Sequence, residues 1–277
     1  MHKEIRTRTS GISRVHIERA VRKAGYSMVV QHDHPYFELY YVERGACRFM
    51  IDDNMHDLRG GDFVLIPPRT LHFTRYLFGA CKRVDIYFRS EDVSEAVLST
   101  LPQGADFFLQ TQIFQVPDAY RDHVAALFSR MAAEARIGDA QSAQILYFQL
   151  QELFLLCVRV CTFSQDVPAD IHTADRQVLL AARFISKNYM RAITAADIAT
   201  AAGFSPNYLS RKFREAAGIS IHEYLVLTRL RHAATELVST DDTVTQIALR
   251  CGFSGSNYFK DAFKKKYGMT PSEYRNE

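Results

Sequence analysis

The stretch from Ile198 to Tyr224, IATAAGFSPNYLSRKFREAAGISIHEY, decides the fold of the C-terminal part of this chain, because a diverged copy follows it. The second copy runs from Ile247 to Tyr274 and reads IALRCGFSGSNYFKDAFKKKYGMTPSEY, with one extra residue between its GFS and its NY. An internal repeat indicates that one structural unit is used twice. We therefore expect two similar helical units near the C-terminus.

Each copy has the residues of a helix, a tight turn and a second helix. In the first copy Thr194 is placed to cap a short helix, and Gly203 suits a left-handed turn. Ser205 and Pro206 can then start the next helix. This order predicts two helix-turn-helix units. The second copy offers Thr243 or Thr245 as the cap, Gly252 for the turn, and Ser254 or Ser256 at the start of its second helix.

The exposed faces of the second helices carry side chains that suit DNA. Amides and guanidinium groups can read base edges, and lysines can hold phosphates. The segment 175–277 has fifteen Lys or Arg residues against ten Asp or Glu residues, while the whole chain has a net charge of +3. This excess favours DNA binding over a purely structural repeat. The predicted DNA-binding residues are Asn207, Tyr208, Ser210, Arg211, Lys212 and Arg214 in the first copy, and Ser256, Asn257, Lys260, Asp261, Lys264 and Lys265 in the second.

Between the two copies, apolar residues recur at helical spacing from Ser220 to about Ser239, which predicts one linking helix with Arg229 and Arg231 facing outward. A helix of about twenty residues is about 30 Å long, close to one turn of duplex DNA. The two second helices could therefore enter successive major grooves. We expect binding to a tandem, non-palindromic site.

This C-terminal part resembles the AraC/XylS family of transcription regulators, whose signature falls here on IALRCGFSGSNYFKDAFKKKYGMTPSEYR. The resemblance implies activation of transcription through contact with RNA polymerase. Asp261 is an unusual residue beside phosphates, so it must accept from a cytosine amino group or pair with Lys264 or Lys265, and we expect the pairing. The family's base-reading positions fall on Asn207, Ser210 and Arg211 in the first unit, and on Ser256, Asn257, Lys260 and Asp261 in the second.

Two runs in the N-terminal part, SMVVQHDHPYFELYYVERG and GGDFVLIPPRTLH, resemble the two motifs of cupins. The resemblance implies a small antiparallel β-barrel in which three imidazoles and one carboxylate converge, a set that suits Fe, Mn, Ni or Zn. Arg69 stands where a glycine is usual, and Tyr76 where an asparagine is usual. The four converging side chains are those of His32, His34, Glu38 and His72.

Three roles are open for these four side chains. They could hold a divalent transition metal, contact a small organic effector, or form hydrogen bonds at the barrel rim with Glu38 paired to an arginine. We expect that no cofactor is required. Tyr40 and Arg14 are further candidates for the effector pocket, and Arg19 and Arg22 could close with Arg14 over an anionic ligand.

Two helices are predicted over residues 118–136 and 140–160, before a linker of sequence FSQDVPADIHTA. We therefore place an effector-binding domain at 1–170 and a DNA-binding domain at 171–277. Intramolecular packing and homodimerisation are both open for the apolar stripe of the second helix. The stripe consists of Leu146, Leu150, Leu153, Phe154, Cys157 and Cys161.

Composition agrees with a cytoplasmic protein that does not enter a membrane, because 47% of the 277 residues are hydrophobic without a long apolar run or a signal peptide. No nucleophile elbow, phosphate loop or kinase signature appears. We predict an α+β fold with an N-terminal cupin-like β-barrel and a C-terminal all-α tandem helix-turn-helix domain. We expect an effector-responsive regulator that binds double-stranded promoter DNA, a small-molecule effector and RNA polymerase, and is not an enzyme. The alternative is a metal-dependent cupin enzyme or metal sensor fused to a DNA-binding domain.

Overall fold

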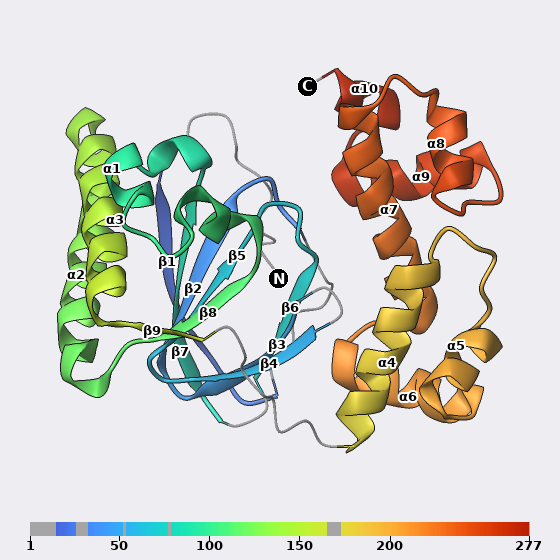
Figure 1. The fold of residues 1–277 in the computed structure, drawn as a ribbon, viewed down its shortest axis with the longest axis horizontal. Helices are drawn as coiled ribbons and strands as arrows, with labels where there is room; N and C mark the ends of the chain where they lie inside the picture. The colour runs from blue at the N-terminus through green and yellow to red at the C-terminus, as the bar shows by residue number, and fades with distance from the viewer. Residues whose placement is uncertain (1–14, 26–32, 52–53, 77–78, 165–172, 277) are drawn as a thin grey trace.

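Strands fill the N-terminal half of the chain and helices fill the C-terminal half, as predicted (Figure 1). The computed structural model describes residues 15–25, 33–51, 54–76, 79–164 and 173–276. The strands are β1 (His16–Arg22), β2 (Phe37–Arg44), β3 (Ala46–Ile51), β4 (Asn54–Arg59), β5 (Asp62–Ile66), β6 (His72–Arg75), β7 (Cys81–Phe88), β8 (Gln112–Gln115) and β9 (Thr162–Ser164).

The strands form two antiparallel sheets. The large sheet has the order β1-β7-β2-β5-β8-β9, and the small sheet has the order β4-β3-β6. A shared core lies between them, with Tyr40 and Ile66 from the large sheet and Phe49 and Leu58 from the small one. Among the described residues no hydrogen bonds join the sheets into a closed barrel, so the cupin-like arrangement is confirmed but closure is not.

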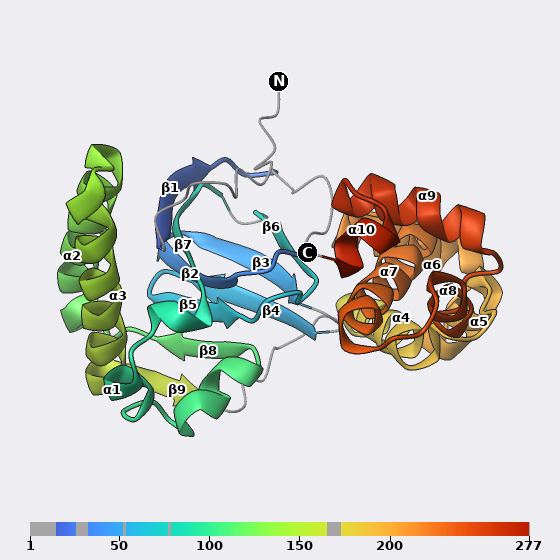
Figure 2. The ribbon, with the colours of Figure 1, turned by 90° about the horizontal axis from the view of Figure 1, so that it is seen from above.

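Two long helices cover the outer face of the large sheet (Figures 1 and 2). They are α2 (Asp118–Ile137) and α3 (Ala140–Val160), close to their predicted bounds. Side chains alternate along a strand, so β2 contributes to the cores on both faces of the large sheet. Tyr40 faces the small sheet. Tyr41 faces the helices, where its ring centroid lies 4.5 Å from that of Phe63 and 5.2 Å from that of Phe128. The predicted stripe of α3 is buried here, which is the intramolecular packing that the sequence left open.

By length and composition alone, α3 is also the one described helix that could cross a membrane. Its Leu150 and Phe154 are fully buried against α2 and the large sheet. Its exposed side carries Gln144, Glu152 and Arg159 among apolar residues. One side of α3 thus packs on the N-terminal half, and the other side is exposed.

The C-terminal helices form two groups joined by one helix, α7, which the sequence predicted (Figure 1). Arg229 and Arg231 of α7 do not face outward as predicted, because both are half-buried. The Arg229 guanidinium donates to the carbonyls of Tyr189 and Arg191 at 2.8 Å each, satisfying groups that the end of a helix leaves free. The helices are α4 (Thr173–Asn188), α5 (Ala195–Ala202), α6 (Pro206–Ala217), α7 (Ile221–Ser239), α8 (Val244–Arg250), α9 (Ser256–Tyr267) and α10 (Pro271–Arg275).

These helices lie against the small sheet, on the side of the molecule away from α2 and α3 (Figure 2). Met50, Leu71 and Phe73 share one hydrophobic core with residues of α4 such as Val178 and Ile185. The strand–helix contact therefore joins the two halves through apolar side chains.

Candidate functional sites

The first helix-turn-helix unit consists of α5 and α6, and its local chemistry is the one predicted. Thr194 caps α5: its hydroxyl accepts from the Asp197 N–H at 3.2 Å, and the Asp197 carboxylate accepts from the Thr194 N–H at 2.8 Å. Gly203 ends α5 with φ 73°, a left-handed conformation that favours glycine. Ser205 precedes α6 and Pro206 is its first residue.

The second unit consists of α8 and α9. Thr243, rather than Thr245, caps α8. Ser256 is the first residue of α9, as one of the two predicted alternatives had it, and Gly255 takes the cap position before it. Gly252 has φ 86°, and a Cβ there would lie 2.4 Å from the Tyr189 carbonyl oxygen. This turn therefore packs directly on the end of α4, which needs a glycine for space as well as for φ.

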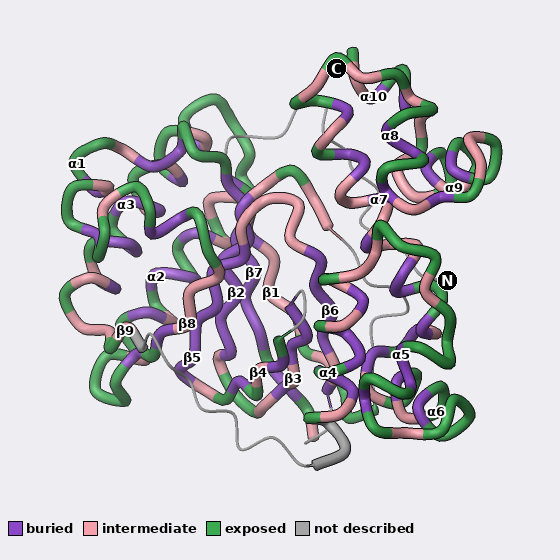
Figure 3. The backbone as a smooth tube through the Cα atoms, turned by 45° about the vertical axis from the view of Figure 1, so that its right-hand side comes forward, coloured by how far each residue is buried: buried purple, intermediate pink, exposed green. Residues whose placement is uncertain are grey.

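The predicted DNA-binding residues lie on α6 and α9, where exposed and buried stretches alternate along each helix (Figure 3). Both helices turn their phenylalanines inward: Phe213 of α6 and Phe259 and Phe263 of α9 are fully buried. Lys212 and Ser256 are half-buried, and the other ten predicted residues are exposed. Each unit thus has one polar face that points away from its core. The contacts of these two faces with DNA stay a prediction.

Charged residues on these faces differ between the units. On α6, Glu215 lies 2.9 Å from Lys212 and 3.8 Å from Arg211, whose guanidinium lies 5.3 Å from the Tyr208 ring centroid. On α9, Asp261 makes no ion pair with a lysine among the described residues, so the expected pairing is not observed. The interpretation of Asp261 as an acceptor for cytosine stays open.

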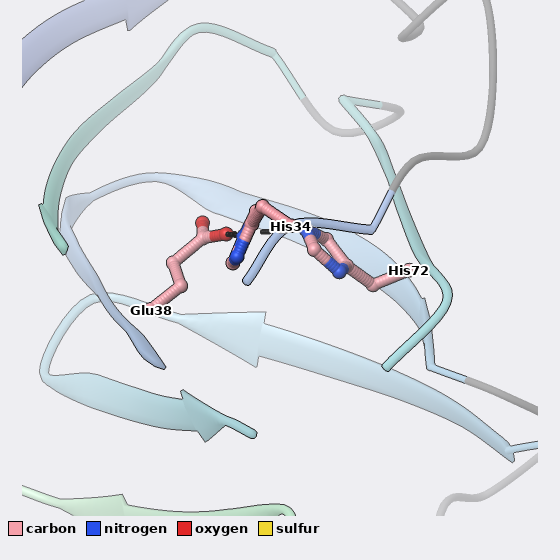
Figure 4. A group of neighbouring side chains, drawn as sticks. All are labelled: His34, Glu38 and His72. Atoms are coloured by element: carbon pink, nitrogen blue, oxygen red, sulfur yellow. Dashed lines mark hydrogen bonds and ion pairs between the residues drawn. The ribbon is translucent and has the colours of Figure 1, made fainter. Parts of the chain in front are cut away.

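A second group of polar side chains lies in the N-terminal half (Figure 4). Nε2 of His34 lies 2.9 Å from Oε2 of Glu38, and Nε2 of His72 lies 3.1 Å from the same oxygen. The three ligand atoms all lie within 4.8 Å of one another. The structure thus brings together three of the four residues predicted from the cupin motifs; His32 and Arg14 lie outside the described residues. We call these three side chains the His/Glu cluster.

The contacts of Nδ1 determine the tautomer of each histidine, while Nε2 faces Glu38. Nδ1 of His34 lies 2.9 Å from the Tyr36 carbonyl oxygen, and Nδ1 of His72 lies 2.9 Å from that of Thr70. Because a carbonyl only accepts, each Nδ1 carries a hydrogen. A neutral ring therefore presents a lone pair at Nε2. Two such lone pairs and a carboxylate need a shared proton or a cation between them, and this donor set fits a divalent transition metal.

The protonation of the His/Glu cluster follows from its burial. Burial by itself raises the pKa of Glu38, but His72 and His34 together outweigh it and hold that pKa well below its usual range. Burial lowers the pKa of His72, but the attraction of Glu38 outweighs it and raises that pKa. The partners of Glu38 are thus histidines, and no arginine of the described part of the chain pairs with it.

The remaining effector-pocket candidates lie elsewhere. Tyr40 belongs to the core between the sheets, where its hydroxyl lies 3.1 Å from that of Tyr76. Arg19 and Arg22 do not belong to a free arm, because β1 pairs with β7 along its whole length. Arg19 instead forms an ion pair with Glu43 at 2.7 Å. Strand alternation indicated Tyr87 as a residue of the barrel core or pocket wall, and its ring lies 5.4 Å from that of His34.

Two helix-turn-helix units beside a β-domain are an arrangement typical of DNA-binding transcription regulators. Comparison with family models agrees. A model described as a helix-turn-helix domain matches residues 198–277, and a model described as an AraC-like ligand-binding domain matches residues 18–150. The chain belongs to the AraC family of transcription regulators.

Individual relatives fit this assignment. The chain is 25% identical over 271 residues to the transcriptional activator RhaS of Klebsiella pneumoniae, covering 96% of this chain and 93% of that protein. It is 43% identical over 112 residues to the regulator YijO of Escherichia coli, covering 39% of this chain and 40% of that protein. A solved structure of a DNA-binding transcriptional dual regulator from Escherichia coli is 30% identical, covers 36% of this chain and 95% of its own, and has a TM-score of 0.34.

Proposed function

We propose that this regulator is an effector-responsive activator that inserts α6 and α9 into successive major grooves of promoter DNA. The exposed polar faces of these two helices carry the proposal. The helix that joins the units supports it: α7 has 19 residues. At 1.5 Å per residue α7 spans about 28 Å, near the rise of one turn of duplex DNA.

The two units suit different tasks. In the first unit, Asn207 and Arg211 can make paired hydrogen bonds to base edges. In the second, Lys264 and Lys265 are exposed near the end of α9 and suit phosphates. We therefore infer one specific half-site and one looser half-site, arranged in tandem.

Selection of binding sites from random DNA by the full-length protein, followed by footprinting, tests this function. Replacing Arg211 with Ala should cost about 1–3 kcal/mol and relax base preference in one half of the selected site. Replacing Lys264 with Ala should weaken binding to all sequences alike and lower the salt dependence by about one counterion. If both variants keep the parent's affinity and base preference, α6 and α9 are not the DNA-reading helices.

We further propose that the His/Glu cluster is the regulatory site and that a divalent transition metal is one ligand it accepts. His34, Glu38 and His72 would hold the ion, which would supply the positive charge that a proton otherwise provides. Native mass spectrometry of the purified protein, with and without Zn²⁺, tests this. The wild type should retain one ion, and His72→Ala should retain none. A bound organic molecule in the spectrum instead would assign the site to a small organic effector.

Homodimerisation is supported by the exposed face of α3. Ile145, Phe148 and Leu155 lie on one side of this helix and are 39%, 61% and 44% exposed. Large apolar side chains in one stripe suit contact with a second copy of the chain. Sedimentation of Phe148→Glu beside the wild type tests this, since only a dimer held by α3 would dissociate.

An activator of this kind would work in the cytoplasm and contact RNA polymerase at the promoter.

A further inference from the structure

Asp33 lies where the N-terminal half meets the second helix-turn-helix unit. It precedes β2, and its side chain is 1% exposed. Oδ1 lies 2.9 Å from Nζ of Lys266, in the last turn of α9, and Oδ2 lies 3.9 Å from Nη1 of Arg69. The carboxylate accepts no hydrogen bond among the described residues, so charge alone holds it in this buried position.

Other side chains of the second unit also face Asp33. Burial lowers the pKa of Arg231 in α7, and the attraction of Asp33 opposes this change. Burial raises the pKa of Tyr267 in α9, and the charge of Asp33 raises it further. One carboxylate of the N-terminal half therefore acts on the helix that joins the units and on the second recognition helix.

Arg69 forms the other link to the second unit. It has φ 62°, a left-handed conformation that is strained for any residue with a Cβ. Its N–H donates to the His34 carbonyl oxygen at 2.8 Å, and its guanidinium lies 5.1 Å from the ring centroid of Tyr274 in α10. A glycine would relieve the strain but would lose the contact with the Tyr274 ring. The contacts of the arginine side chain therefore account for a strained residue at this position.

The two helix-turn-helix units are held on the N-terminal half by different forces. The first unit and α4 share a hydrophobic core with Met50, Leu71 and Phe73, and Arg183 of α4 adds a hydrogen bond to Asn54 at 3.0 Å. Among the described residues, the hydrophobic core of the second unit includes no residue of the N-terminal half. Burial of apolar surface gives a net favourable free energy, so the first contact persists. The attraction in a buried ion pair is nearly offset by the cost of desolvating its two charges, so the second contact separates more readily.

We propose that Asp33, Arg69 and Lys266 form a charge latch through which the His/Glu cluster controls the second helix-turn-helix unit. The inference rests on the proposed function. His34 follows Asp33 directly and its carbonyl accepts from Arg69, so displacement of His34 moves both the acid and its neighbouring cation. A ligand that displaces Nε2 of His34 from Glu38 opens the latch, whereas an ion held by both groups keeps it closed.

Opening the latch strengthens DNA binding for an electrostatic reason. In the closed state Asp33 neutralises Lys266, which lies in the last turn of α9 together with Lys264 and Lys265. The pairing cancels one positive charge near the end of α9, so the second unit attracts phosphates less strongly. In the open state Lys266 becomes available and the second unit can adjust to its half-site.

The test measures the affinity of full-length variants for two DNA fragments obtained by selection with the wild type. One fragment has both half-sites, and the other has the second half-site scrambled. The latch variants are Asp33→Asn, Lys266→Met and their double mutant, and His34→Ala mimics displacement of the histidine. Asp57→Asn is the matched control, because it removes the same charge from an aspartate of the small sheet that pairs with Arg48 and lies outside the latch.

We expect Asp33→Asn and His34→Ala each to bind the complete fragment at least about fivefold more tightly, with no gain on the scrambled fragment. Their effects should not add, and the salt dependence of Asp33→Asn should steepen by about one counterion. In the Lys266→Met background, Asp33→Asn should have no further effect. Equal gains on both fragments, an equal gain in Asp57→Asn, or additive effects overturn the latch. If the wild type selects no sequence at all, the proposed function fails and the latch with it.

Discussion

Replacing Gly252 with Ala tests how the second helix-turn-helix unit packs on the end of α4. At φ 86° an alanine adopts a left-handed conformation that costs about 1–2 kcal/mol. The new Cβ would also lie 2.4 Å from the Tyr189 carbonyl oxygen and 2.9 Å from Nε of Arg229. Backbone must move to relieve that overlap, which adds about 1–3 kcal/mol. We expect the second unit to lose about 2–5 kcal/mol in total.

Gly203, at the same place in the first unit, provides the matched control. Its φ of 73° carries a similar conformational cost, but the nearest atom to a Cβ would be Nε2 of Gln177 at 3.9 Å. Gly203→Ala should therefore cost only about 1–2 kcal/mol. The difference between the two variants isolates the overlap at Gly252 from the strain in φ.

Hydrogen exchange of the full-length protein, followed peptide by peptide, is the suitable assay because it reports local opening in each unit. Protection should fall in residues 247–274 of Gly252→Ala by more than it falls in residues 198–224 of Gly203→Ala. Equal losses in the two variants, or a larger loss in Gly203→Ala, would refute the close approach of Gly252 to α4.

Three further outcomes follow from burial, capping and charge. Leu150→Ala in the core beneath α3 should lower the free energy of unfolding by about 2–5 kcal/mol in urea titrations, whereas Ile137→Ala, 63% exposed, should change it by less than about 0.5 kcal/mol. Thr194→Ala removes the cap of α5 and should cost about 1 kcal/mol, with faster hydrogen exchange confined to the first turn of α5. Burial, aided by Arg231, lowers the pKa of His232 to about 4, below its ordinary 6.5. The folded state therefore resists protonation, and stability should fall as pH drops from 6.5 towards 4; this loss should be smaller in His232→Phe when melting is compared at pH 7 and pH 5.

The C-terminal domain was predictable in detail because its signals are local. The caps Thr194 and Thr243 and the turn glycine Gly203 act within a few residues of their own helices, so the repeat alone places them. The failures concern longer contacts. Arg229 was expected in solvent because helical spacing does not reveal that the end of α4 lies beside it.

The N-terminal half was predictable in its motifs but not in its connections. The cupin-like spacing correctly brought His34, Glu38 and His72 together, because strand pairing fixes these positions. Arg19 was assigned to an arm because nothing in its sequence shows that β1 pairs with β7. The contact of Asp33 with Lys266 joins distant segments through charge, and no periodicity or motif encodes such a pair.

The helix α7 belongs to the hydrophobic cores of both units: Tyr224 and Leu225 lie in the first core, and Leu230 and Leu237 lie in the second. Inserting one residue between these pairs would turn one unit by about 100° relative to the other and shift it by about 1.5 Å. The side chains that α7 contributes to one of the two cores would then no longer face that core. An insertion or deletion in this helix therefore destabilises one unit, whereas substitutions on the outer faces of α6 and α9 leave both cores intact.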